Sequence, residues 1–215
     1  TESLLALAQG LTVVLADDEE MLLPWKQAEL ITKYNCTAAQ FTPSRLQLSL
    51  SNEDFGRSAK NLEVVIVAGE NMPLLLVNKF KDISSARLVN MYGPTEATVY
   101  VTVGELFANE TVTIGRPLNN CRIYILDEKY KPVLPTVWGE IYIAGICLSD
   151  GYLFRPDLTE AAFLPDPFFP GQKMYKSGDL GRIRSDGRLE CGGRTDSQIK
   201  INGVRVELGE ITGAL

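Results

Sequence analysis

Hydrophobic positions in the first hundred residues form short continuous apolar runs that alternate with segments of helical character. The continuous runs predict buried strands at residues 11–16, 36–41, 62–68 and 87–91. Two segments that carry Pro near their start predict helices at residues 24–34 and 73–81. Repeated strand–helix–strand units of this kind predict a parallel sheet with helices on its faces.

After about Val103 the pattern changes to short, alternating segments separated by turn residues. These segments predict strands at residues 122–126, 140–144, 182–184 and 188–190, and one helix at residues 156–163. Residues 196–206 predict a hairpin with Asn202-Gly203 at its turn, and a helix is expected to begin at Glu207. The expected fold class is therefore α/β, a parallel sheet with flanking helices followed by a smaller β-rich, barrel-like subdomain.

The composition is that of a globular chain of 215 residues, 45% hydrophobic and 22% charged, with a net charge of −6. The acidic balance argues against non-specific nucleic-acid binding, which needs a basic surface. No apolar run approaches the roughly 20 residues of a membrane span, and the chain begins without a secretory signal. We therefore expect a cytoplasmic protein that has neither nucleic acid nor membrane as its partner.

Cysteine and histidine narrow the chemistry further. Cys36, Cys121, Cys147 and Cys191 form no CxxC pair, which favours buried free thiols in a reducing compartment over a zinc or redox motif. The chain has no histidine, which removes Ser-His-Asp catalysis, Cys-His catalysis and His-ligated metals from this segment. Cys147 as a nucleophile would need a base that its sequence neighbours do not supply, so a buried thiol is the favoured interpretation.

The run from Asn90 to Glu96 is the most informative stretch of the sequence. Gly93-Pro94 ends the preceding strand sharply, and the run supplies the ring of Tyr92, the hydroxyl of Thr95 and a carboxylate. A ring stacks on a base, a hydroxyl bonds a phosphate oxygen, and a carboxylate suits Mg²⁺. Ligands of parallel sheets bind at the carboxyl ends of the strands, where this run lies. Taken alone, the run is equally compatible with a plain loop that holds a core aromatic.

Further motifs follow in order, at residues 139–145 (GEIYIAG), 151–153 (GYL), 175–180 (YKSGDL), 193–200 (GRTDSQIK) and 203–211 (GVRVELGEI). Together with the first run they resemble the middle and late core motifs of a nonribosomal peptide synthetase adenylation domain, within the acyl-adenylate-forming superfamily. The resemblance covers essentially the whole chain. It implies that residues 1–110 are the second half of the α/β core, 111–195 the β-rich subdomain, and 196–215 the hinge with the truncated start of a C-terminal lid.

The resemblance implies an ATP-dependent, AMP-forming ligase. In that family the substrate carboxylate attacks the α-phosphorus of ATP, pyrophosphate leaves, and the aminoacyl adenylate passes to the phosphopantetheine thiol of a carrier protein. ATP and Mg²⁺ are then the cofactors, since Mg²⁺ and fixed donors offset the charge that gathers on the phosphate oxygens. The implied partners are an amino acid and a carrier domain of the same polypeptide, in the synthesis of antibiotics and other secondary metabolites.

Several residues acquire nucleotide roles by this resemblance. By the resemblance, Glu96 would hold Mg²⁺, and the Thr95 hydroxyl would bond the phosphate. The resemblance likewise implies that Tyr92 packs on the adenine, and that Asn90 and the backbone of Gly69 border it. Without the neighbouring motifs, a core aromatic would be the preferred interpretation of Tyr92.

Later motifs supply the ribose and lid residues. Asp179 would accept hydrogen bonds from both ribose hydroxyls, with Arg194 near the ribose or phosphate. A simple Gly-Asp turn and a surface salt bridge are the alternatives for these two residues. Asp196 resembles the hinge of the lid, where a few residues absorb a large backbone rotation. Lys200 resembles the lid-loop residue that acts in the second half-reaction and joins Thr95 and Glu96 as catalytic, a solvated strand lysine being its alternative.

The resemblance also places a substrate pocket at Thr1, Gln40, Ile66, Ala68, Met91, Val99 and Tyr100. No member of this set is charged, which favours a substrate with a neutral side chain. Gln40 and Thr1 would hydrogen-bond a polar group, and Tyr100 would limit the depth of the pocket. The alternative is that several of the seven are ordinary core residues.

The chain departs from the family pattern at its ends. The phosphate-binding loop and the aspartate that pairs with the substrate amino group are expected upstream of Thr1, and a lid lysine beyond Leu215. We therefore expect the fragment alone to be inactive and its parent to be active. Cys147 and Asp150 stand where the family more often has Gly and Arg. The alternative functions are a D-alanine–carrier ligase, an aryl- or acyl-CoA synthetase, and a non-catalytic nucleotide-binding fragment.

Overall fold

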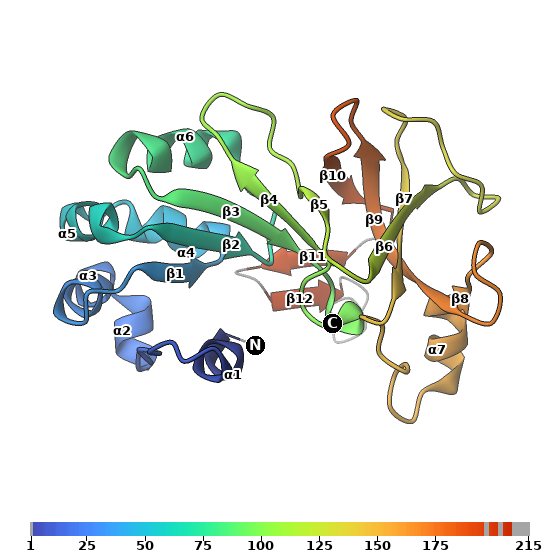
Figure 1. Ribbon diagram of the computed structural model, residues 1–215, viewed down its shortest axis with the longest axis horizontal. Helices are drawn as coiled ribbons and strands as arrows, with labels where there is room; N and C mark the ends of the chain where they lie inside the picture. The colour runs from blue at the N-terminus through green and yellow to red at the C-terminus, as the bar shows by residue number, and fades with distance from the viewer. Residues whose placement is uncertain (1, 196–197, 202–203, 208–215) are drawn as a thin grey trace, which may run out of the picture. The chain divides into compact units, whose positions relative to one another are not determined.

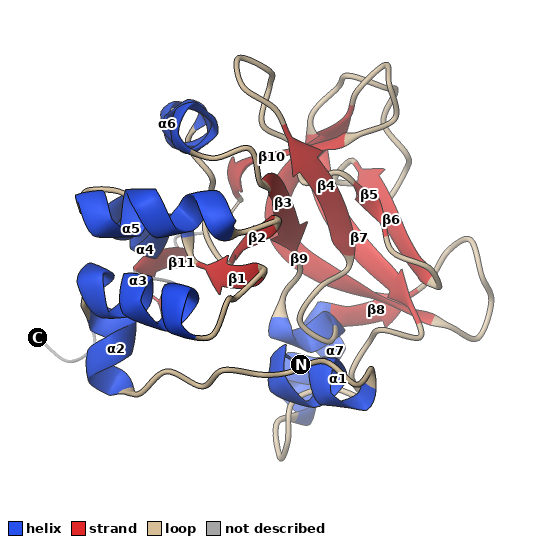
Figure 2. Ribbon diagram, turned by 60° about the vertical axis from the view of Figure 1, so that its left-hand side comes forward, coloured by secondary structure: helices blue, strands red, loops and turns tan. Residues whose placement is uncertain are grey.

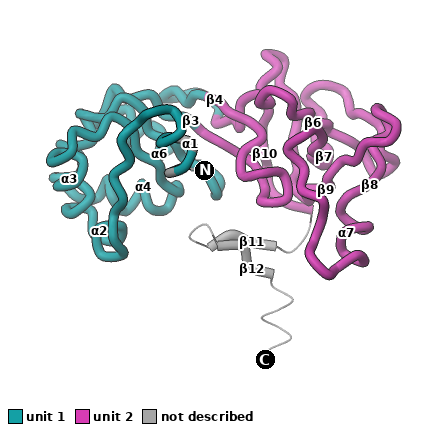
Figure 3. Tube along the Cα trace, turned by 60° about the horizontal axis from the view of Figure 1, so that its bottom comes forward, with its two compact units in different colours: residues 1–89, 105–111 teal, residues 90–104, 112–215 magenta. Residues whose placement is uncertain are grey.

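A computed structural model describes residues 2–195, 198–201 and 204–207, coloured along the chain in Figure 1. The chain divides into two compact units (Figure 3). The first comprises residues 1–89 and 105–111, and the second comprises residues 90–104 and 112–215. No helix in the described ranges is both long enough and apolar enough to cross a bilayer.

The first unit carries most of the helices, and their starts follow from local sequence. The elements are α1 (Glu2–Ala8), α2 (Asp18–Leu22), α3 (Pro24–Lys33), α4 (Pro43–Ser49), α5 (Glu53–Ser58), the 3₁₀ turn η1 (Ala59–Asn61) and α6 (Leu74–Ile83). Asp17 caps α2 in a reciprocal capping box with Glu20. The side chains of Thr42 and Asn52 cap α4 and α5. Pro24 occupies the first turn of α3, where its missing N–H has no effect.

Strands β1 (Ala38–Phe41) and β2 (Val64–Ala68) pair in parallel, with Gln40 opposite Ile66. The sheet continues through β3 (Arg87–Tyr92), β4 (Thr102–Leu106) and β5 (Arg116–Pro117) in the order β1-β2-β3-β4-β5. Because β4 and β5 pair antiparallel, this sheet is mixed rather than wholly parallel as the sequence predicted.

Helices pack beside the parallel pair of strands in the first unit. Helix α3 packs against α5, and α4 against β1 and β2, as Figure 2 shows. The core between them contains the fully buried side chains of Leu46, Phe55, Val65 and Val67. The continuous apolar character of β2 is therefore explained by burial in this core.

The predicted helices at 24–34 and 73–81 and the strands at 36–41, 62–68 and 87–91 are confirmed, with ends shifted by a few residues. The predicted strand at residues 11–16 is wrong, because this segment has no regular secondary structure. Leu11 and Leu15 are 61% and 78% exposed. An apolar run becomes a strand only where a neighbouring backbone pairs with it, and among the described strands none pairs with this segment.

The second unit is built on an antiparallel sheet of order β10-β9-β7-β6, with β8 also paired to β9. Its strands are β6 (Cys121–Leu126), β7 (Gly139–Gly145), β8 (Phe163–Pro165), β9 (Lys173–Ile183) and β10 (Leu189–Arg194). Helix α7 (Pro156–Ala162) lies before β8. The buried core of the second unit includes the side chains of Ile125, Ile141, Ile143 and Phe163. The predicted antiparallel character is confirmed, although the segment predicted at 182–184 is the end of the much longer β9.

Near the end of the chain, β11 (Gln198–Ile201) and β12 (Val204–Glu207) pair antiparallel, as the predicted hairpin requires. The expected turn at Asn202-Gly203, the hinge at Asp196 and the helix after Glu207 lie outside the described residues.

Candidate functional site

The loop that follows β3 folds back tightly on its own strand. The Val101 N–H donates to the Tyr92 carbonyl at 2.8 Å, which closes the loop. A Cβ atom at Gly93 would lie 2.5 Å from the Val99 carbonyl oxygen, so only glycine fits there. Thr95 begins the 3₁₀ turn η2 (Thr95–Ala97), and its side chain is exposed. Glu96, the next residue, is only 6% exposed, so the loop presents a hydroxyl and buries a carboxylate.

Asp179 on β9 connects this loop to the antiparallel sheet within the second unit. The Tyr92 hydroxyl donates to Asp179 Oδ2 at 2.6 Å. Arg194 Nη1 donates to Asp179 Oδ1 at 2.6 Å in a mostly buried ion pair. Burial, together with the adjacent negative charge of Asp179, raises the pKa of Tyr92 well above its usual value, so its hydroxyl stays protonated. Tyr92 and Arg194, both predicted to contact the nucleotide, are therefore joined through Asp179, the third such residue.

Backbone and side-chain bonds hold Asp179 in place. The Ser177 hydroxyl donates to the Ile141 carbonyl at 2.7 Å and accepts the Asp179 N–H at 3.0 Å. The Gly178 N–H donates to Glu140 Oε1 at 3.1 Å. Because an ionised carboxylate offers about four acceptor positions, two donors leave Asp179 capacity for hydroxyl groups of a ligand.

Glu96 is held by the segment between β7 and α7. The Tyr152 hydroxyl donates to Glu96 Oε1 at 2.7 Å. The Ser149 N–H donates to the Glu96 carbonyl at 2.9 Å. The sequence interpretation gave Tyr152 no role, although it lies in the GYL motif that supported the family resemblance. The position of this tyrosine in a recognised motif was the signal that could have identified it.

Asn90 and the pocket residues of the second unit lie on β3 and its loop. Asn90 is buried, and its Nδ2 donates to the Thr113 carbonyl at 2.8 Å, which anchors a neighbouring backbone segment. Met91 on β3 and Tyr100 are half-buried. Val99 is 38% exposed with a φ of 72°.

The remaining predicted residues lie in the first unit or outside the described part. Gln40 and Ile66 face each other as register partners on β1 and β2, and both are half-buried. Ala68 ends β2 in the core, and Gly69 follows with a φ of 87°. Thr1 and Asp196 lie outside the described residues. Lys200 belongs to β11, whose backbone is described.

The residues present fit a Mg²⁺ ion that is shared with a ligand. The described residues contain no group of three or more carboxylate, Cys or His side chains able to hold a metal by themselves. Mg²⁺ is commonly bound through one or two carboxylates together with substrate phosphates and water. A single positioned carboxylate at Glu96, beside the exposed hydroxyl of Thr95, matches that arrangement.

All four cysteines are free thiols. Cys147 is buried, which agrees with the expected buried thiol, whereas Cys36, Cys121 and Cys191 are half-buried. Burial, assisted by the neighbouring Cys121 thiol, raises the pKa of Cys147 to about 12. Cys147 is therefore a thiol rather than a thiolate at neutral pH, which argues against a nucleophilic role.

Comparison with known proteins identifies the family of the chain. Residues 1–153 match the AMP-binding enzyme family. The chain is 40% identical over 212 residues to enterobactin synthase component F of Escherichia coli strain K12, covering 94% of this chain and 16% of that protein. The chain belongs to the AMP-binding enzyme family. More narrowly, it is part of an adenylation domain homologous to those of nonribosomal peptide synthetases.

Two solved structures are similar in fold. One is a four-domain nonribosomal peptide synthetase bound to AMP and glycine, with a TM-score of 0.84, 34% identity, and coverage of 98% of this chain and 16% of that chain. The other contains adenylation and PCP domains bound to a vinylsulfonamide inhibitor, with a TM-score of 0.83, 26% identity, and coverage of 89% and 34%. The chain thus spans only a minor part of its relatives.

Proposed function

We propose that the parent protein, the full-length protein that contains this chain, activates an amino acid with ATP. The reaction forms an aminoacyl adenylate and releases pyrophosphate. The observation that carries this proposal is the cluster of Tyr92, Asp179 and Arg194, joined by two hydrogen bonds, in a chain of the AMP-binding family.

The cluster supports recognition of a nucleoside. The carboxylate of Asp179 is suited to accept hydrogen bonds from vicinal ribose hydroxyls. These hydroxyls are neutral donors, so the carboxylate does not repel them. Its bond to the Tyr92 hydroxyl fixes one edge of the ring beside that carboxylate. The adenine would then pack on Tyr92, with Asn90 and Gly69 bordering it and Arg194 on the ribose or phosphate.

The loop of Thr95 and Glu96 supports the phosphate chemistry. The exposed Thr95 hydroxyl would donate to a phosphate oxygen, and the Glu96 carboxylate would ligate Mg²⁺. A bound Mg²⁺ would neutralise charge that develops on the phosphate oxygens during attack by the substrate carboxylate. Thr95 would also restrict the orientation of the phosphate, which lowers the entropic barrier to attack.

We propose that the pocket residues Gln40, Ile66, Ala68, Met91, Val99 and Tyr100, with Thr1, select an amino acid with a neutral side chain. Their lack of charge supports this proposal, because a charged side chain would need a buried counter-charge.

We further propose that the adenylate passes to the phosphopantetheine thiol of a carrier domain in the same polypeptide. A similar solved protein contains adenylation and PCP domains. In this step Asp196 would serve as the hinge, and Lys200 would enter the site from the lid.

The test is amino-acid-dependent exchange between pyrophosphate and ATP on the parent protein, across a panel of amino, aryl and fatty acids. Exchange with one or a few amino acids, lost in Glu96→Ala, is the expected result. Exchange only with carboxylic acids that lack an amino group would assign the protein to the aryl- or acyl-CoA ligases instead. An absence of exchange, with nucleotide still bound, would leave a non-catalytic nucleotide-binding protein.

A further inference from the structure

Three hydrogen bonds join the loop that carries Glu96 to residues 147–152, about fifty residues later in the sequence. The Thr98 hydroxyl donates to the Cys147 carbonyl at 2.6 Å. The Ser149 N–H donates to the Glu96 carbonyl, and the Tyr152 hydroxyl donates to the Glu96 carboxylate at 2.7 Å. One of these bonds holds the backbone of the loop at Glu96, one holds the Thr98 side chain, and the third holds the Glu96 carboxylate itself.

Tyr152 is itself held in one position. Its N–H donates to the Thr159 hydroxyl at 2.9 Å. Its ring packs edge-on against Phe163 with centroids 5.8 Å apart, and Phe163 packs against Tyr175 at 5.1 Å. Gly151 has a φ of 140°, and a Cβ there would overlap Thr159, so this approach to Tyr152 requires glycine.

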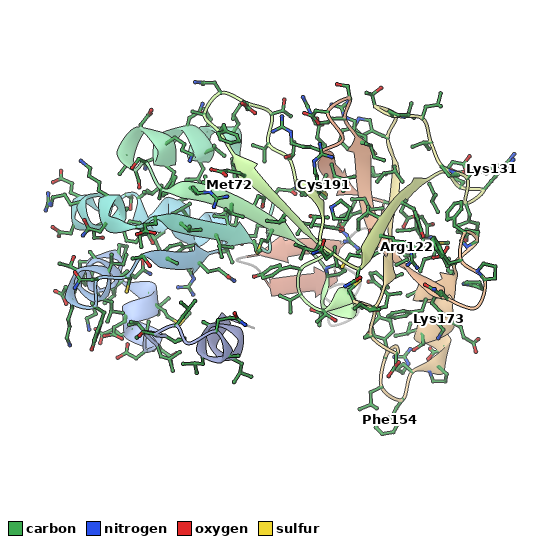
Figure 4. The ribbon with its side chains drawn as sticks, viewed as in Figure 1. Met72, Arg122, Lys131, Phe154, Lys173 and Cys191 are labelled. Carbon is green, nitrogen blue, oxygen red and sulfur yellow. The ribbon has the colours of Figure 1, made fainter. Side chains whose placement is uncertain are left out.

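The residues after Tyr152 behave differently. Leu153 and Phe154 are 81% and 89% exposed, and Figure 4 shows Phe154 at the outer end of this loop. Tyr152 alone of these three turns toward the core and reaches Glu96. The inward orientation of the side chain is therefore specific to Tyr152 and is not shared by the residues that follow it.

We propose that Tyr152 is a positioning residue that orients the Glu96 carboxylate for Mg²⁺ bound with nucleotide. This inference rests on the proposed function, in which Glu96 is a metal ligand. A hydroxyl bonded to one carboxylate oxygen restricts the rotation of the group, and such charge-assisted bonds are among the stronger ones in proteins. Without it, Glu96 would have to lose rotamer freedom each time a metal binds.

The same arrangement explains why a cysteine at position 147 is compatible with the bonds that hold the Glu96 loop. The loop that carries Glu96 is bonded by the carbonyl of Cys147 and the N–H of Ser149, which are backbone groups. A change of side chain at Cys147 leaves that carbonyl in place.

The experiment measures binding of a fluorescent, non-hydrolysable ATP analogue to the parent protein, with and without Mn²⁺ as a probe for Mg²⁺. In Tyr152→Phe we expect the gain in affinity on adding Mn²⁺ to fall about tenfold, the equivalent of one charged hydrogen bond. Affinity without metal should be unchanged, because the ring and its packing remain.

Tyr124→Phe is the matched control. It removes a hydroxyl that donates to the buried carboxylate of Asp166 at 3.1 Å, in the same unit, so it should leave the metal-dependent gain unchanged. Thr98→Ala removes the bond to the Cys147 carbonyl and should reduce the metal-dependent gain in affinity by less than Tyr152→Phe does. Thr98→Ser keeps the hydroxyl and should keep the full gain.

Glu96→Ala separates failure of this inference from failure of the proposed function. If Glu96→Ala keeps the metal-dependent gain, the metal role of Glu96 is wrong and the inference fails with it. If Glu96→Ala loses the gain while Tyr152→Phe matches Tyr124→Phe, only the positioning role is overturned. A Tyr152→Phe variant that loses affinity equally with and without metal would also overturn it, because that pattern marks a general structural defect.

Discussion

Replacing Asp179 by Asn gives the sharpest test of the proposed nucleoside site. The change keeps the size of the side chain and removes its charge. In the structure the two carboxylate oxygens accept from Tyr92 and Arg194, each at 2.6 Å. Hydrogen bonds to charged groups contribute about 1.5–3 kcal/mol each, and an amide oxygen preserves one of the two. We therefore expect the free energy of unfolding to fall by about 2 kcal/mol.

The effect on nucleotide binding is measured as discrimination against 2′,3′-dideoxy-ATP, which lacks both ribose hydroxyls. If Asp179 accepts from these hydroxyls, the parent protein should bind ATP about 30- to 150-fold more tightly than the dideoxy analogue, the equivalent of about 2–3 kcal/mol. Asp179→Asn should reduce this ratio to less than about tenfold, because a neutral acceptor forms weaker bonds. Both affinities are measured by titration of the folded variants.

Asp166→Asn is the control for this measurement. Asp166 is also buried, and it accepts from Arg122 at 3.3 Å and from Tyr124 at 3.1 Å (Figure 4 labels Arg122). Asp166→Asn should lower the free energy of unfolding and leave the ratio of the affinities for ATP and 2′,3′-dideoxy-ATP unchanged. An unchanged ratio in Asp179→Asn, or a parent protein that binds both nucleotides equally, would refute the ribose role.

Three further predictions follow from individual contacts. Gly93→Ala should lower exchange activity at least tenfold, because its Cβ would lie 2.5 Å from the Val99 carbonyl oxygen; a variant with unchanged kinetics would contradict this. Cys147→Ala should keep exchange within about threefold, and native Cys147 should resist maleimide at pH 7, because burial raises its pKa to about 12. Glu190→Gln should lower the free energy of unfolding by about 2 kcal/mol at pH 7, measured by denaturant titration.

The loss of stability in Glu190→Gln should depend on pH. Burial acts to raise the pKa of Glu190, but its bonds to Arg184 and Arg182 outweigh burial and lower it below the ordinary value of 4.5. A carboxyl group whose pKa is lower in the folded state contributes stability above its unfolded pKa. The difference between wild type and Glu190→Gln should therefore be full above about pH 5 and shrink as the pH falls below 4.5. A difference that persists at pH 2 would contradict the ionic origin of the effect.

Much of the first unit was predictable because its signals are local. Pro24 at a helix start and the continuous apolar run at 62–68 each determined one element without reference to the rest of the chain. The helices at 43–49 and 53–58 were not predicted, although Thr42 and Asn52 carry capping side chains immediately before them. The strand predicted at 11–16 failed for the opposite reason, because an apolar run alone does not supply a pairing partner.

The sequence by itself determined the family and the sharp turn after the strand at 87–92, because the ordered motifs and Gly93-Pro94 can be read residue by residue. Only the tertiary structure brought Tyr92 to Asp179 across 87 positions, and Tyr152 to Glu96 across 56. The physical reason is that periodicity and turn chemistry depend on neighbouring residues. A hydrogen bond between distant side chains depends on the register and packing of the strands that carry them.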